Sequence, residues 1–137
     1  MSNAFTLHPR LAADTIALGD WPLCRLLLMN DARYPWMILV PARPDLREIH
    51  DLSPAERAML IEEIARASAA MQQAFEADKM NVAALGNQVP QLHVHVIARF
   101  LGDPAWPNPV WGQGAAQPMS EAVRAARIGR LRPLLAG

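Results

Sequence analysis

Two histidines, His93 and His95, stand one residue apart in the stretch 91–99 and are the strongest candidates for chemistry. This stretch alternates polar and apolar residues, a pattern that predicts a β-strand. Side chains alternate across a strand, so Gln91, His93 and His95 should share one face, with neighbours about 6.5–7 Å apart. Two imidazoles at that spacing can act on one phosphate group. One can attack phosphorus, and the other, as an imidazolium, can stabilise charge or protonate the leaving oxygen.

The histidine pair by itself also allows two other interpretations. Two histidines on a wet sheet face can be without function. A His-x-His pair on a strand also occurs at zinc and iron sites, where a third ligand is needed. His8, His50 and Asp51 could supply that ligand, but none of them stands at a telling spacing. A metal-dependent enzyme therefore stays open at this point.

Local patterns predict the elements that must position the pair. Apolar runs bounded by turn residues predict strands at 15–18, 23–29, 36–40 and 81–85, while residues 1–14 suggest an arm or a short first strand. Ser53, Pro54 and Glu56 combine an N-cap, a first-turn proline and a capping-box glutamate, so a helix should run from there to about Glu76. Its apolar stripe should face the sheet and comprises Leu60, Ile64, Ala67, Met71 and Phe75. The positions off the stripe should be wet and include Glu62, Glu63, Arg66 and Gln73.

The chain becomes proline-rich after the histidine strand, so residues 103–112 cannot form a central strand. A final helix is expected from Ser120 to about Leu131, with its arginines on a solvated face. These elements predict an α+β fold, in which an antiparallel sheet carries one long helix and a C-terminal helix on one side. We expect one domain over residues 1–137, with a core at about 15–100 and a proline- and tryptophan-rich extension at 101–137.

Composition excludes several partners and classes. The 137 residues carry no formal net charge, which argues against nucleic acid or an anionic membrane as a partner. Cys24 is the only cysteine, so no intrachain disulfide can form, which fits a reducing compartment. The apolar run around Cys24 is too short and too interrupted to span a bilayer. The start of the chain lacks the pattern of a signal peptide, so the expected location is cytoplasmic.

The histidine stretch and its surroundings resemble the histidine triad (HIT) family of nucleotide hydrolases and transferases. The family signature alternates three histidines with apolar residues, and Gln91 stands at the position of the first. The resemblance covers roughly residues 20–100 and includes Asn30, the Val-Pro pair at 40–41, the helix entry at 49–53 and the Gly-Asn pair at 86–87. The tail around Trp106 and Trp111 is similar to that of bacterial diadenosine polyphosphate hydrolases.

The resemblance implies a role for each matching residue. His93 would attack an α-phosphorus and form a nucleotidyl-histidine that water hydrolyses, and His95 would contact phosphate or bridging oxygens. Asn87 would touch phosphate and Asn30 the ribose. Gln91 could still position the nucleophile by hydrogen bonding, but it cannot titrate near neutral pH. Outside the signature, Arg99 could hold a phosphate or be a surface charge, and Trp106 and Trp111 could stack on a base or dock on a second subunit.

The expected function is therefore hydrolysis of a nucleotide at an α-phosphate, with diadenosine polyphosphates as the substrate class. The resemblance implies no obligatory metal or organic cofactor, and the two tryptophans on the proline-rich tail make a homodimer attractive. Gln91 replaces one family histidine, and Trp36 stands where a fourth, upstream histidine is usual. These two changes motivate the alternative of a non-catalytic nucleotide-binding or regulatory protein.

Overall fold

A five-stranded antiparallel sheet forms the centre of the protein, whose structure, a computed structural model, describes residues 4–136. The order of the strands across the sheet is β1-β2-β3-β5-β4, and every neighbouring pair is antiparallel. The strands are β1 (Thr15–Asp20), β2 (Cys24–Met29), β3 (Trp36–Pro41), β4 (Lys79–Ala83) and β5 (Val94–Arg99). β3 and β5 are buried along their whole length, which places the histidine stretch next to the middle of the sheet.

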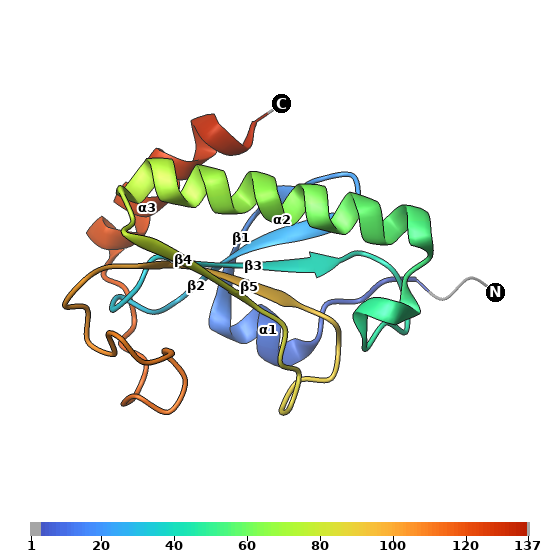
Figure 1. Cartoon of the computed structure of the whole chain (residues 1–137), viewed down its shortest axis with the longest axis horizontal. Coiled ribbons are helices and arrows are strands. Elements are labelled where there is room, and N and C mark those ends of the chain that lie inside the picture. Colours follow the sequence, from blue (N-terminus) through green and yellow to red (C-terminus); the bar gives the residue numbers. More distant parts are fainter. Residues whose placement is uncertain (1–3, 137) are drawn as a thin grey trace.

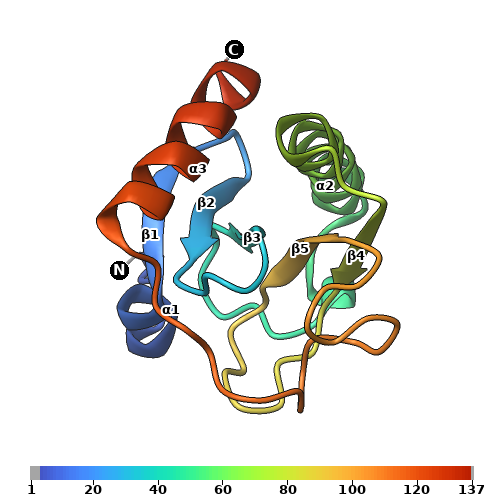
Figure 2. The ribbon, with the colours of Figure 1, turned by 90° about the vertical axis from the view of Figure 1, so that its left-hand side faces the viewer.

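Two helices cover one face of the sheet, α2 (Pro54–Phe75) and α3 (Glu121–Leu135), as Figures 1 and 2 show. The capping signal at Ser53 is confirmed, because its hydroxyl accepts the N–H of Glu56 at 3.2 Å. Leu60, Ala67 and Met71 of the expected stripe pack into the larger hydrophobic core between α2 and the sheet. The α+β class with a long helix on an antiparallel sheet is confirmed. No helix within residues 4–136 is long and apolar enough to cross a membrane.

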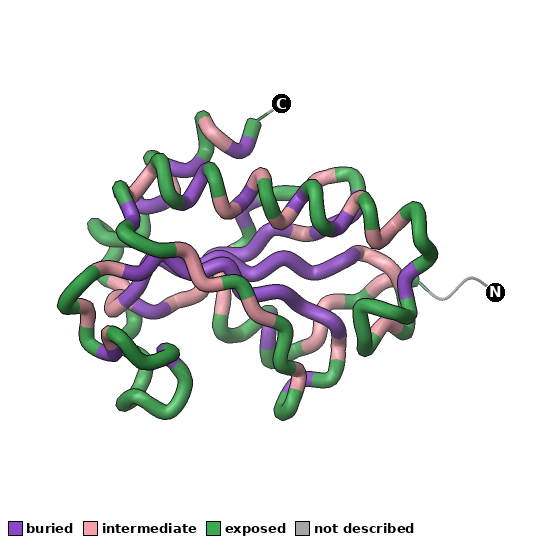
Figure 3. The backbone as a smooth tube through the Cα atoms, in the orientation of Figure 1, coloured by how far each residue is buried: buried purple, intermediate pink, exposed green. Residues whose placement is uncertain are grey.

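The opposite face of the sheet is also covered, and part of this cover is a short helix that the sequence does not predict. Helix α1 (Pro9–Asp14) lies below the sheet in Figure 1, together with the loop that follows β5. His8 starts α1 by accepting the N–H of Arg10 on its ring nitrogen at 3.1 Å, and Leu11 is buried in a second hydrophobic cluster. The prediction of an arm or a strand over this segment is wrong because a helix of this length shows no periodicity. Figure 3 shows the buried strands between the two layers.

Two charged residues that the sequence places on exposed faces are buried instead. The carboxylate of Glu63 accepts the backbone N–H of Leu23 at 2.9 Å and that of Cys24 at 2.8 Å. The guanidinium of Arg127 donates to backbone carbonyls that include those of Asp31 and Ala32, both at 2.7 Å. Both side chains satisfy main-chain groups that would otherwise be buried without partners. Helical periodicity cannot reveal this role, because the partners come from distant turns.

The strand predicted at 91–99 begins only at Val94. Pro90 has no N–H to give to a ladder, and the N–H of Leu92 donates to the carbonyl of Leu46 at 2.9 Å rather than to a strand. His93 therefore lies at the mouth of the strand and His95 within it. Gln91 leaves the sheet altogether, so strand alternation does not orient its side chain.

Candidate functional site

His93 and His95 lie side by side, with their ring centroids 4.9 Å apart. Each is only 7% exposed, yet both border a cavity on the lower face of the sheet. The strand pairing holds His95 opposite Ile38 of β3, which fixes the backbone under the pair. The prediction that the two imidazoles face one site is therefore supported by their geometry, although the surrounding face is apolar rather than wet.

A backbone carbonyl sets the tautomer of His93. Its ring nitrogen Nδ1 lies 2.7 Å from the carbonyl oxygen of Gln91. A carbonyl can only accept, so Nδ1 carries the proton in the neutral ring and Nε2 keeps its lone pair. That is the tautomer a nucleophilic imidazole needs. The bond comes from the main chain, so it does not depend on which side chain stands at position 91.

The neighbouring His95 has the opposite arrangement. The indole N–H of Trp36 donates to His95 Nδ1 at 3.0 Å, so the ring proton of His95 sits on Nε2. Burial, helped by the nearby His93, lowers the pKa of His95 to about 3. His95 is therefore neutral at neutral pH in the free protein. It can still donate one hydrogen bond from Nε2 to an anionic oxygen.

The buried neutral His95 should make the protein sensitive to mild acid. Its folded-state pKa lies below its unfolded value near 6.5, so stability is lost as the pH falls below about 6.5. Between pH 6 and 4 this one group should lower the free energy of unfolding by about 1.4 kcal/mol per pH unit. Urea unfolding of the wild type and of His95→Asn across this range measures the difference, since both share all other groups. Equal slopes for the two proteins would contradict the assignment.

Tryptophans form an aromatic wall around His95. The ring centroid of Trp111 lies 5.0 Å from that of His95 and 5.9 Å from that of Trp36, in both cases edge to face. Trp111 comes from the proline-rich loop, which folds back under the sheet to reach the histidines. Trp106 lies elsewhere, with its ring 5.6 Å from the guanidinium carbon of Arg99.

The cavity beside the histidines has a volume of about 360 Å³. This volume lies within the range of small-molecule binding sites. Asn87 and Trp111, both expected at the site, line it. Residues for which the sequence indicated no role also line it, and they include Arg10, Leu11, Asp14, Met29, Ile38 and Val89. Three of those lie on α1, whose existence no sequence pattern revealed, so no signal could have found them.

Besides Trp106, two further residues expected to bind substrate lie away from this cavity. The side-chain oxygen of Asn30 accepts the N–H of Met119 at 2.8 Å, at a separate cavity near the start of α3. Arg99 is 1% exposed and is bound by the carboxylate of Asp103 at 2.7 and 2.9 Å. Arg99 is therefore neither a phosphate ligand in the cavity nor a surface charge, the two roles expected for it. It anchors the loop that carries Trp106 and Trp111.

Gln91 does not contact His93 through its side chain. Its amide oxygen accepts the N–H of His8 at 2.8 Å, and its amide nitrogen donates to the carbonyl of Thr6 at 2.9 Å. Both partners belong to the N-terminal segment that leads into α1. The side chain of Gln91 therefore holds the segment that supplies one wall of the cavity.

Replacing Gln91 with alanine should loosen this N-terminal segment without changing the tautomer of His93. Two hydrogen bonds are lost, each worth about 1 kcal/mol, so amide exchange at Thr6, Leu7 and His8 should accelerate by roughly ten-fold or more. Hydrogen exchange read by mass spectrometry measures this. Gln73→Ala, an exposed glutamine on α2, is the matched control. Unchanged exchange over residues 6–8 would contradict the role.

Comparisons with known proteins decide the family. The sequence model of the HIT domain matches residues 10–102, which is more than half of the chain. The chain belongs to the HIT family. Members of this family bind nucleotides and are often nucleotide hydrolases. In this HIT-family protein, the backbone carbonyl of Gln91 accepts the hydrogen bond of His93, and the indole of Trp36 donates a hydrogen bond to His95.

Solved structures of bacterial histidine triad proteins are similar over nearly the whole chain. One from Bradyrhizobium japonicum is 48% identical, covers 98% of this chain and 100% of its own, and superposes with a TM-score of 0.96. One from Marinobacter aquaeolei VT8 is 51% identical over 97% of each chain, with a TM-score of 0.94. A histidine triad nucleotide-binding protein from Sulfolobus tokodaii, 14% identical with a TM-score of 0.67 over 88% of this chain and 83% of its own, shares the fold. No curated protein matches the chain.

A metal site at His93 and His95 would need a third ligand, and none lies beside the pair in the part of the chain that the structure describes. Within residues 4–136, no group of three or more His, Cys, Asp or Glu side chains converges on one point. His8, His50 and Asp51 do not join the pair at the cavity. The histidine pair is thus arranged by hydrogen bonds to Gln91 and Trp36 rather than by a ligand cage.

Proposed function

We propose that this protein hydrolyses a nucleotide at its α-phosphate, with His93 as the nucleophile. The observation that carries the proposal is the bond from His93 Nδ1 to the carbonyl of Gln91 at 2.7 Å, which leaves Nε2 free at the edge of the cavity. An imidazole with a fixed tautomer beside a cavity is suited to covalent catalysis. Membership in a family of frequent nucleotide hydrolases supports the same conclusion.

The reaction proceeds in two displacements at phosphorus. His93 Nε2 forms a P–N bond while the bond from phosphorus to the bridging oxygen breaks, and the remaining phosphate chain leaves with the electron pair. Water then forms a new P–O bond as the P–N bond breaks, which releases a nucleoside monophosphate and a proton and restores His93. His95 Nε2–H donates to a non-bridging oxygen through both steps. A neutral N–H donor at this place can stabilise the negative charge that develops on the phosphate oxygens, and His95 does not have to be protonated to do so.

The walls of the cavity suit a nucleoside attached to that phosphate. Leu11, Met29 and the edge of Trp111 offer apolar and aromatic surface for a base. Asn87, beside Gly86 in its left-handed conformation with φ of +75°, lies where the α-phosphate would approach His93. We propose a dinucleoside polyphosphate such as diadenosine tetraphosphate as the substrate class.

A covalent intermediate provides the decisive test. The protein should release labelled nucleoside monophosphate from diadenosine tetraphosphate that carries ³²P at the α-positions. Denaturation in alkaline detergent during turnover, which preserves P–N bonds, should retain label on His93, located by peptide mapping. A protein that shows neither turnover nor label, with phosphoanhydride and phosphoramidate substrates alike, would overturn the enzymatic proposal.

A nucleotide-binding protein without turnover is the second candidate. Its supporting observation is that the side chain of Gln91 binds the N-terminal segment, so no side chain at the first triad position reaches His93. Calorimetry with adenosine monophosphate and diadenosine tetraphosphate separates the two candidates. Binding with no product formed over many hours would favour this one.

We also propose that the protein forms a homodimer through β4. This strand is an edge of the sheet, where main-chain groups are open to pairing, and Val82 on it is 46% exposed. The tryptophans of the tail, which made a dimer attractive from the sequence, pack within the same chain instead. Sedimentation of the wild type and of Val82→Lys tests the proposal, and a wild-type monomer would overturn it.

A further inference from the structure

A second cavity opens on the other side of His93. Its volume is about 280 Å³, and it shares Leu85, Gly86 and His93 with the first cavity. The turn at 85–86 therefore separates two cavities that both reach the imidazole. The rest of its wall includes the chain between Arg47 and His50, which leads into and begins the short helix η1 (Ile49–Asp51).

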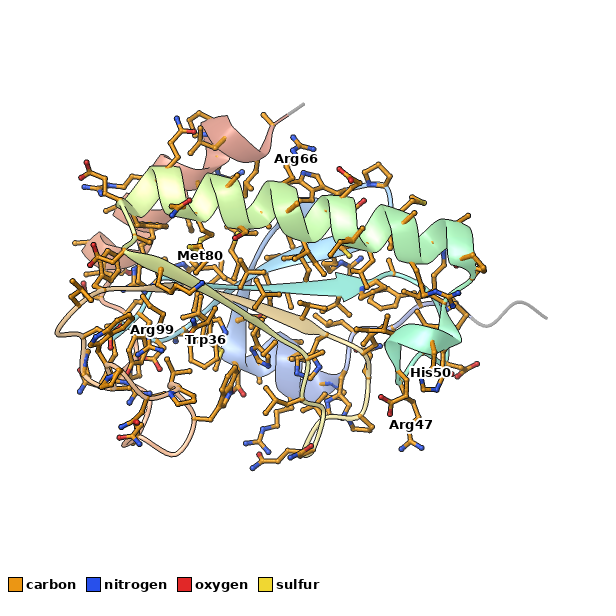
Figure 4. The ribbon with its side chains drawn as sticks, in the orientation of Figure 1. Trp36, Arg47, His50, Arg66, Met80 and Arg99 are labelled. Atoms are coloured by element: carbon orange, nitrogen blue, oxygen red, sulfur yellow. The ribbon has the colours of Figure 1, made fainter. Side chains whose placement is uncertain are left out.

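The two cavities differ in chemistry. The first is bordered by tryptophans and aliphatic side chains, whereas Arg47, Glu48 and His50 give the second a polar wall. Arg47 and His50 are both exposed. In Figure 4 their side chains lie near one another at the η1 turn, far from Arg99 at the other end of the sheet.

The carboxylate of Asp51 near this cavity already has partners in the backbone. It accepts the N–H groups of Arg47 at 3.1 Å and of Glu48 at 2.9 Å, and the N–H of Asp51 donates to the backbone carbonyl of Glu48 at 3.0 Å. In contrast, neither the guanidinium of Arg47 nor the imidazole of His50 has a hydrogen bond or an ion pair with any residue among 4–136. The carboxylate of Asp51 thus has its partners within the turn, and the exposed side chains of Arg47 and His50 border the cavity.

We propose that this second cavity binds the phosphates beyond the α-phosphate, the part of the substrate that leaves when His93 attacks. The inference rests on the proposed function and adds the leaving group to it. With the nucleoside in the first cavity and the α-phosphorus at His93, the chain of phosphates passes Gly86 and meets Arg47 and His50. An anionic leaving group matches this wall, because a guanidinium fork binds phosphate oxygens well. A protonated amine, which is the leaving group of a phosphoramidate, would be repelled by the positive charge of the Arg47 guanidinium.

Nucleotide binding measures this contact separately from catalysis. The parent for the titrations is full-length His93→Asn, which blocks turnover, and the ligands are adenosine monophosphate and ATP. ATP should bind about ten-fold more tightly than the monophosphate, because its β- and γ-phosphates reach the second cavity. Adding Arg47→Glu should remove most of that ten-fold gain and leave the affinity for the monophosphate unchanged. The gain should also shrink as salt is raised.

Matched variants control for general electrostatics. Arg124→Glu makes the same charge change at an exposed position on α3 and should preserve the gain, and Arg47→Lys should preserve part of it. The proposal is overturned if ATP binds no better than the monophosphate, or if the gain survives Arg47→Glu. Turnover by the wild type tests separately whether the protein is a hydrolase. If ATP binds more tightly than adenosine monophosphate but the wild type shows no turnover, the hydrolase proposal is contradicted and the proposal of a phosphate-binding second cavity stands.

Discussion

His93→Asn should abolish hydrolysis of diadenosine tetraphosphate, with kcat lowered by roughly 10⁴-fold or more. The amide of asparagine cannot form the P–N bond, so the two-step route through a covalent intermediate is closed. The affinity for adenosine monophosphate should stay within a few-fold, because the walls of the cavity come from other residues. Steady-state product release and calorimetry measure the two effects separately.

The matched control for this variant is His8→Asn. It makes the same exchange at a histidine outside the cavity, and asparagine caps a helix well, so α1 should persist. The control should retain activity, and His93→Asn should lose the ³²P label as well as the turnover. Activity of His93→Asn close to that of the wild type would show that another residue is the nucleophile.

Removing the carboxylate of Asp103 should destabilise the protein by about 3–5 kcal/mol. Asp103→Ala leaves the guanidinium of Arg99, which is 1% exposed, without its bidentate partner. The same carboxylate accepts the N–H groups of Phe100 at 3.1 Å and Trp106 at 2.8 Å, and these lose their partner too. Burial works against ionisation of Asp103, but Arg99 and the N–H donors outweigh it and lower its pKa to about 2.

Urea unfolding of Asp103→Ala against Asp20→Ala tests this prediction. Asp20 pairs with Arg25 at 3.2 Å on the surface, where both side chains are exposed, so its loss should cost less than about 1 kcal/mol. Similar losses for the two variants would contradict the buried role of Asp103. Asp103→Ala should also raise the KM for nucleotides, because the loop that Arg99 and Asp103 anchor carries Trp111 to the cavity.

The strands and the long helix could be predicted because their signals are local. Ser53, Pro54 and Glu56 begin α2 through bonds within one turn, and the apolar runs of β2 and β3 need only their own burial. Helix α1 escapes prediction for the opposite reason. It is shorter than two turns, and it is stable because Leu11 packs under the sheet rather than because of any periodic pattern.

Charged residues gave the most misleading signals. Sequence patterns place Glu63, Arg99 and Arg127 on wet or functional surfaces, but each is buried against main-chain groups or a partner from elsewhere in the fold. A prediction based on hydrophobic periodicity places every charged side chain in solvent. This prediction fails where buried main-chain groups at the end of a loop or strand need a charged side chain as a hydrogen-bond partner. Only the tertiary structure shows where such main-chain groups lie.

The sequence by itself determined that two imidazoles lie at one place, since their spacing along a single segment sets this. That His93 is the candidate nucleophile came from the resemblance to the HIT family. Only the tertiary structure decided which tautomer each of the two histidines adopts and how burial affects the protonation of His95. Trp36 reaches His95 across 59 positions of sequence, and Gln91 reaches His8 across 83. Protonation, tautomer and the wall of the cavity depend on such contacts between distant segments, which no local pattern encodes. The side chain of Gln91 thus holds the cavity wall, while its backbone carbonyl fixes the tautomer of His93.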